Sequence, residues 1–79
     1  MIKVNIVHIS DKVLHDGMAE HVVVPGVMGD FEVVEDHIPI VSLLTRGTVM
    51  VWNWNTLEEI PIRQGLMRFD GKELFGVVE

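Results

Sequence analysis

Four histidines are the side chains in this sequence that most readily suggest chemistry. His8, His15, His21 and His37 carry ring nitrogens that can bind a metal ion, but none is spaced as His-x-x-x-His and the chain has no cysteine. We therefore predict no metal site. We expect His8 and His21 to face solvent or a partner from strands, with their ring nitrogens in ordinary hydrogen bonds.

Four carboxylates, Asp30, Glu32, Glu35 and Asp36, crowd one short stretch. Paired carboxylates can carry out acid–base chemistry when burial drives their pKa values apart. In a domain this small, acids beside turns are usually solvated. We predict that these acids are not catalytic and that a loop displays them to basic loops of a partner.

Trp52 and Trp54 could stack single-stranded bases if a basic groove guided the nucleic-acid backbone. The chain instead has twelve acidic against six basic residues and a net charge of −6, which repels phosphate. Trp52 and Trp54 are two positions apart, so on a strand both indoles would face the same side, where they would serve core packing or a protein contact. Because no phosphate-binding loop, nucleophile elbow or Ser/His/Asp arrangement is present, we predict no enzyme activity, no cofactor and no nucleic-acid partner.

The elements that hold these residues read as β-strands. Val and Ile supply 21 of 79 residues, and β-branched side chains favour a pleated surface. No segment carries the apolar period of a long helix or the ~20 apolar residues of a bilayer span. We predict one domain, residues 1–79, folded as a flattened antiparallel β-sandwich of about eight to ten short strands. The strands are predicted at residues 2–7, 21–24, 31–34, 40–44, 48–52, 57–62, 66–69 and 72–78.

Turn residues separate these strands. Asp16-Gly17 predicts a turn before the second pair of strands, and Pro25-Gly26 predicts a type II turn. Asp70-Gly71 predicts a type I′ hairpin, and residues 53–56 predict another hairpin connection. Pro61 cannot donate to a ladder, so its strand is expected at an edge or a bulge. The high apolar content of so short a chain predicts that some apolar surface stays exposed for a partner.

One ordered set of residues resembles a known family. Pro25-Gly26, residues 29–31, Val33, His37 and Pro39, followed by Leu44 and Gly47, look like the N-terminal domain of the F-type ATP synthase epsilon subunit. The resemblance runs through nearly the whole chain, with the opening strand, the Asp16-Gly17 turn and the final hairpin in the family's order. The chain departs from the family's usual pattern at Glu32 and at Glu35-Asp36.

The resemblance implies a non-catalytic subunit of the rotor's central stalk in a proton-translocating ATP synthase, coupling ion flow to ATP synthesis or hydrolysis. It implies that Met28, Gly29 and Asp30 contact the c-ring. It also implies that His37, Ile38 and Pro39 contact the gamma subunit. Such a protein would be peripheral, on the cytoplasmic face of the bacterial inner membrane, and would be bound there through the complex.

The sequence ends after the final predicted strand, so we expect the family's C-terminal helical hairpin, and inhibition by its extension, to be absent. Two alternatives remain open from the residues alone. One is a free-standing small β-domain that binds a small ligand or a metal. The other is an oligonucleotide-binding domain, which the acidic charge disfavours.

Overall fold

A computed structural model describes all residues from 1 to 79 and contains nine β-strands and no helix. The predicted all-β fold is confirmed, and the number of strands lies within the predicted range. No helix of the length and hydropathy needed to cross a bilayer is present. In chain order the strands are β1 (Ile2–His8), β2 (Val13–Ala19), β3 (His21–Gly26), β4 (Gly29–Val34), β5 (Ile40–Leu44), β6 (Gly47–Asn53), β7 (Thr56–Ile62), β8 (Gly65–Phe69) and β9 (Glu73–Val78).

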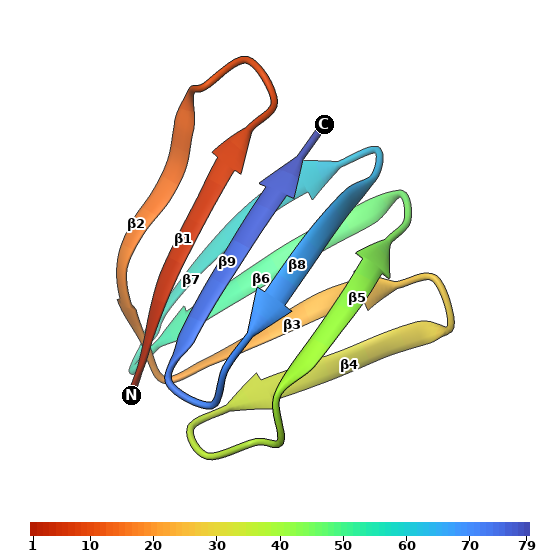
Figure 1. Cartoon of the computed structure of the whole chain (residues 1–79). Helices are drawn as coiled ribbons and strands as arrows, with labels where there is room; N and C mark the ends of the chain where they lie inside the picture. The colour runs from red at the N-terminus through yellow and green to blue at the C-terminus, as the bar shows by residue number, and fades with distance from the viewer.

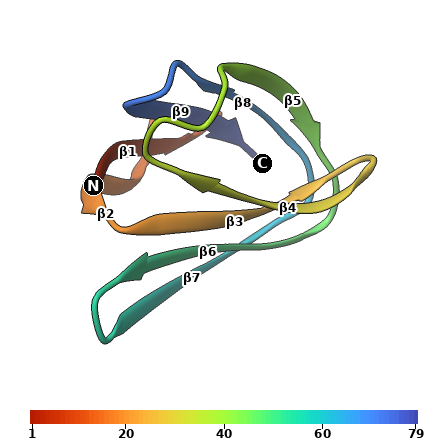
Figure 2. The same ribbon diagram turned by 90° about the horizontal axis from the view of Figure 1, so that it is seen from below.

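The strands form one continuous hydrogen-bonded sheet that folds over into two layers (Figure 1). The sheet runs in the order β2-β1-β9-β8-β5-β3-β6-β7, and β4 pairs with the other side of β3. One layer contains β2, β1, β9, β8 and β5, and the other contains β3, β4, β6 and β7 (Figure 2). The two layers are joined at a single register pair, Gly26 of β3 with Leu44 of β5.

The predicted sandwich has one exception to antiparallel pairing. Strands β1 and β9 are parallel, in register from Lys3 opposite Glu73 to His8 opposite Val78. Parallel neighbours need a long crossover because a tight hairpin reverses the chain direction. Here all seven strands between β1 and β9 form that crossover, so the pairing depends on the whole fold and not on local sequence.

The prediction of a turn at Asp16-Gly17 is wrong. Both residues lie inside β2, where Asp16 pairs with Asn5 and Gly17 pairs with Val4 of β1. The turn lies earlier and is closed by the bond from the His8 N–H to the Lys12 carbonyl, at 2.7 Å. Pairing with β1 therefore overrides the turn preference of the Asp-Gly pair. Asp and Gly are poor strand formers, but an edge strand such as β2 tolerates them.

The inner faces of the two layers bury only apolar side chains. Alternate residues of β1 point inward, as the period of two predicted, and no polar or charged residue is buried. The side chains meet as one cluster between the layers, so burial fixes which face of each strand points outward. The buried cluster comprises Ile2, Val4, Ile6, Ala19, Val22, Val24, Val33, Leu44, Val49, Val51, Ile60, Ile62, Met67, Phe69, Leu74 and Val78.

The β6–β7 hairpin and its proline agree with the sequence. Asn53 pairs with Thr56 around the two-residue turn Trp54-Asn55, and β7 is the last strand of the sheet, as Pro61 predicted. Trp54 lies in the turn with a φ of 58° and is exposed, whereas Trp52 lies on β6 and stacks on His21. Because Trp54 lies in the turn and not on the strand, the prediction that both indoles face the same side of one strand does not apply.

The β8–β9 turn is where Asp70-Gly71 predicted it, but its type is different. Only Gly71 has a positive φ, at 105°, whereas a type I′ turn needs positive φ at both central residues. The Asp70 carboxylate instead accepts the backbone N–H groups of Lys72, at 2.9 Å, and Glu73, at 2.8 Å. These bonds stabilise the charged carboxylate and hold the pKa of Asp70 below its ordinary value. The bond from Glu73 has the largest effect, followed by the bond from Lys72.

The lowered pKa of Asp70 predicts a pH dependence of stability. A carboxylate whose pKa is lower in the folded state stabilises the fold above its unfolded pKa, about 3.9, and this contribution is lost as pH falls through the folded value. We expect Asp70→Asn to reduce the loss of stability as the pH falls below about 4, measured by urea unfolding. Asp30→Asn, which changes an exposed carboxylate on β4, is the control. An unchanged pH dependence in Asp70→Asn would contradict the assignment.

Candidate partner-binding surface

An apolar row crosses the outer face of one layer. The ladders place Val13 of β2, Val7 of β1, Val77 of β9, Leu66 of β8 and Leu43 of β5 side by side. The residue next to each of them in sequence, on the opposite side of the strand, is buried or packs against the core. The five side chains of the row therefore point outward. Leu43 is 60% exposed and Leu66 is 48% exposed. The row therefore spans five strands and is exposed except at Val7 and Val77, which are half-buried.

A second outer row, adjacent to the first, contains Val41, Arg68 and Phe75, which are paired across β5, β8 and β9. Two shallow depressions follow this face, with volumes of about 240 Å³ and 310 Å³. A third, of about 620 Å³, adjoins Leu43 and Leu66 and has seven hydrophobic residues among the ten that line it. We call the outer side chains Val7, Val13, Val41, Leu43, Leu66, Phe75 and Val77 the apolar face. A contiguous apolar surface of this kind usually marks a protein contact.

The predicted c-ring residues lie at the tip of the β3–β4 hairpin. Gly26 pairs with Gly29, so Val27 and Met28 form a two-residue turn. Met28 is 97% exposed, and Asp30 is exposed on β4. The hairpin thus presents an apolar tip beside one negative charge.

The turn of this hairpin differs from the type II turn predicted at Pro25-Gly26. Positive φ occurs at Gly29, at 125°, and not at Gly26. Gly26 is buried in β3, where a Cβ would lie 2.8 Å from the Gly29 carbonyl oxygen and 2.8 Å from the Phe31 ring. Glycine is needed at Gly26 for close packing, and at Gly29 for the backbone conformation.

The predicted gamma-contact residues lie in the loop between β4 and β5. The His37 N–H donates to the Val34 carbonyl at 3.1 Å, and the His37 ring packs edge-on against Phe69 with centroids 6.3 Å apart. Its Nδ1 lies 2.7 Å from the Ile38 carbonyl oxygen. Ile38 is 75% exposed, and Pro39 borders the depression of about 310 Å³ beside Val41. A well-anchored loop therefore presents Ile38 to solvent.

The two predicted segments flank the apolar face at opposite ends of β5. Pro39 precedes the first residue of β5, and the Val27 N–H donates to the carbonyl of Leu43 near its last residue, at 3.0 Å. Val27 and Leu43 also line the same 620 Å³ depression. Sequence reasoning predicted spare apolar surface but not its residues. The signal was present in the alternation of Val41 and Leu43, but assigning it required knowing which parity is buried.

The other candidate residues are dispersed. His15 Nδ1 lies 3.2 Å from Glu58, while His8 Nδ1 accepts the Ser10 N–H at 3.1 Å. His21 lies 3.5 Å from Glu32 and 3.6 Å from Glu20. No group of three His, Cys, Asp or Glu side chains is placed to hold a metal ion.

The crowded carboxylates are not buried by the fold. Asp30, Glu32, Glu35 and Asp36 are all exposed. The burial that drives two pKa values apart in a catalytic pair is therefore missing. The geometry instead defines a small β-sandwich with an exposed, loop-bordered contact face.

Comparison with known proteins identifies the family. The family model described as "ATP synthase, Delta/Epsilon chain, beta-sandwich domain" matches residues 1–75, and the chain belongs to this family. It is 36% identical over 66 residues to the ATP synthase epsilon chain of Alkalihalophilus pseudofirmus, which covers 84% of this chain and 49% of the relative. It is 33% identical over 64 residues to ATP synthase epsilon chain 1 of Nitrobacter hamburgensis, which covers 81% of this chain and 47% of the relative.

A solved structure shares the fold. A chain in the central stalk and c-ring structure of the Tetrahymena thermophila mitochondrial ATP synthase superposes with a TM-score of 0.77 at 10% identity. The match covers 98% of this chain and 62% of that chain. This chain spans about half the length of the curated relatives that it matches.

The close packing at Gly26 makes the geometry of the β3–β4 tip testable. We expect Gly26→Ala to lower the free energy of unfolding by about 1–3 kcal/mol, because the new methyl group overlaps backbone and ring atoms. Gly17→Ala is the matched control, since its Cβ would meet only His15 Nε2, at an ordinary 3.7 Å. Urea unfolding of both variants measures the difference. Equal losses in the two variants would contradict the packing argument.

Proposed function

We propose that this chain is the β-sandwich part of a non-catalytic central-stalk subunit of a proton-translocating F-type ATP synthase. It binds the gamma subunit and the c-ring, and it helps to couple ion flow to ATP synthesis or hydrolysis. Membership of the delta/epsilon family supports this proposal. The single observation that carries it is the apolar row across five strands, which is bordered by two loops suited to different partners.

The gamma subunit is the proposed partner of the apolar face. A flat row of aliphatic side chains gains most when it is covered by another apolar surface, at about 25 cal/mol per Å². Ile38 and Pro39 extend this surface beyond the start of β5. His37 fixes the loop through its bond to Ile38 and its contact with Phe69. The proposed contact is therefore apolar at its centre.

The c-ring is the proposed partner of the β3–β4 tip. Met28 is almost fully exposed, and its flexible side chain adapts to an uneven surface. Asp30 adds a negative charge that pairs with a basic loop and sets the register of the contact. In this role the chain is membrane-associated only through the complex, on the cytoplasmic face of a bacterial inner membrane.

Binding to gamma can be tested by placing a charge in the apolar face. We expect Leu66→Glu to weaken binding to the gamma subunit by about tenfold or more, because a carboxylate would be desolvated at the contact. Since Leu66 is half exposed, the free energy of unfolding should change by less than about 0.5 kcal/mol. Calorimetric titration with purified gamma subunit measures the affinity.

Leu57→Glu on β7 of the other layer is the control for this experiment, because Leu57 is partly exposed outside the apolar face. Its affinity for gamma should stay near that of the unmodified chain. If Leu57→Glu weakens binding as much as Leu66→Glu, or if neither does, the apolar face is not the gamma site.

The c-ring contact can be tested by reversing a charge. We expect Asp30→Lys to lower proton-driven ATP synthesis by the reassembled enzyme while leaving the isolated fold intact, since Asp30 is exposed. Glu59→Lys on β7 makes the same charge change away from the tip and should leave synthesis unchanged. Equal coupling in the Asp30→Lys enzyme and the unmodified enzyme would contradict the assignment of the loop.

A further inference from the structure

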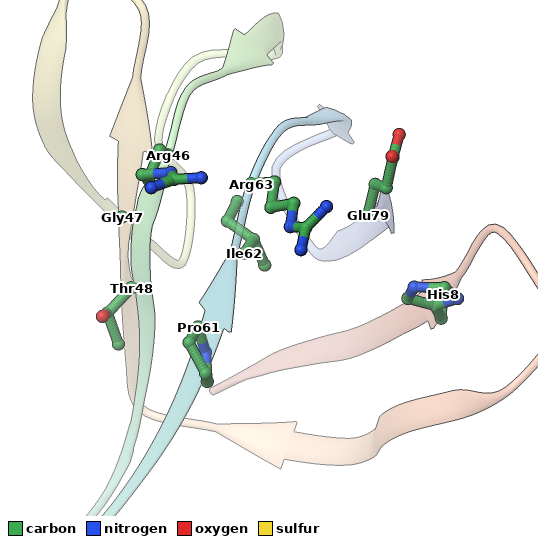
Figure 3. A pocket seen from close by; sticks show the side chains of 8 residues that line it. All are labelled: His8, Arg46, Gly47, Thr48, Pro61, Ile62, Arg63 and Glu79. Carbon is green, nitrogen blue, oxygen red and sulfur yellow. The ribbon is translucent and has the colours of Figure 1, made fainter.

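A polar cleft lies outside the apolar face, between the last residue of β1 and the end of the β6–β7 ladder (Figure 3). It has a volume of about 570 Å³, and most of the side chains that line it are polar or charged. Two of the chain's three arginines, Arg46 and Arg63, line it. The complete lining is His8, Arg46, Gly47, Thr48, Pro61, Ile62, Arg63 and Glu79.

The two arginines lie just beyond the same end of the β6–β7 ladder. The register ends with Gly47 opposite Ile62, and Arg46 and Arg63 are the next residues on the two chain segments. Both residues are exposed and line the same cleft. In a chain of net charge −6, two arginines at one depression are a local concentration of positive charge.

No carboxylate neutralises the arginine pair. All the ion pairs within 4.0 Å involve a histidine or the N-terminal amine, and none involves an arginine. Glu79 lines the same cleft, but its carboxylate lies more than 4.0 Å from either guanidinium group and accepts a hydrogen bond from Gln64 Nε2 at 2.6 Å. The two guanidinium groups thus retain free donors.

The backbone on both sides of the cleft is fixed. The Arg63 N–H donates to the Glu79 carbonyl at 2.6 Å, and the Thr45 N–H, one residue before Arg46, donates to the Pro25 carbonyl at 2.8 Å. Gly47 is packed so closely on Pro25 that a Cβ there would lie 2.7 Å from the proline Cβ. The two arginines therefore start from anchored positions, which lowers the entropic cost of using them together.

His8 offers a third donor. Its Nδ1 accepts the Ser10 backbone N–H at 3.1 Å, so the proton of the neutral ring is on Nε2. Nε2 has no hydrogen-bond partner in the protein. Since His8 lines the cleft, the Nε2–H is available to an acceptor bound there.

We propose that this cleft binds a tetrahedral oxyanion, of which inorganic phosphate is the simplest example, through Arg46, Arg63 and His8. Neither guanidinium group has an ion-pair partner, and an oxyanion accepts charge-assisted hydrogen bonds from such groups. Donors that come from separate strands suit an anion with several oxygens, whereas one guanidinium already saturates the two oxygens of a carboxylate. The inference does not depend on the proposed stalk function.

The test is a titration of the ¹⁵N-labelled 79-residue chain with sodium phosphate at constant ionic strength, followed by NMR. We expect saturable shifts at Arg46, Gly47 and Arg63, similar shifts with sulfate, and binding at least about tenfold weaker with acetate. Arg46→Gln and Arg63→Gln should each lower phosphate affinity by about tenfold. Arg68→Gln, the chain's third arginine, lies outside the cleft and should leave it unchanged.

Thermal unfolding gives an independent readout. Without phosphate, Arg63→Gln should be about as stable as the unmodified chain, because Arg63 is exposed and makes no ion pair. Phosphate should then raise the Tm of the unmodified chain and of Arg68→Gln, but not that of Arg63→Gln. The proposal is overturned by unsaturable shifts, by equal loss of binding in Arg68→Gln, or by acetate binding as tightly as phosphate.

Discussion

The alternation of side chains along paired strands is the constraint on which this structure depends. Sixteen apolar side chains fill the space between the two layers, and the layers are joined through one pair, Gly26 with Leu44. Once this set faces inward, every residue of the other parity must face outward. The apolar face therefore results from the register that builds the core. The strands around it also supply its flanking loops, so the stability of the core and the geometry of the contact surface are linked.

Much of the fold could be predicted from the residues because its signals are local. The period of two at Ile2, Val4 and Ile6 and the edge position of Pro61 follow from short-range chemistry. The features that could not be predicted are set by distant strands. Asp16-Gly17 is held extended by β1, and the parallel pairing of β1 with β9 joins segments about seventy residues apart.

The same distinction applies to the candidate site. Met28, Gly29, Asp30 and His37 were indicated by a family resemblance, and they lie in the β3–β4 hairpin and the β4–β5 loop. The row that contains Val77, Leu66 and Leu43 appears only when three strands are placed side by side. Arg46 and Arg63 are seventeen positions apart and look like two ordinary turn residues. They line one depression because both lie at the same end of the β6–β7 ladder, and a sequence pattern does not provide that pairing.

The parallel β1–β9 pair also affects how the protein is made. A nascent chain emerges from the ribosome with β1 first, but one edge of β1 has no partner until residues 73–78 follow. Pairings between such distant segments slow folding and leave strand edges open to wrong partners. One edge of β1, whose inner face carries Ile2, Val4 and Ile6, thus stays unpaired until residues 73–78 are available. The sandwich therefore closes late in the order in which its strands are made.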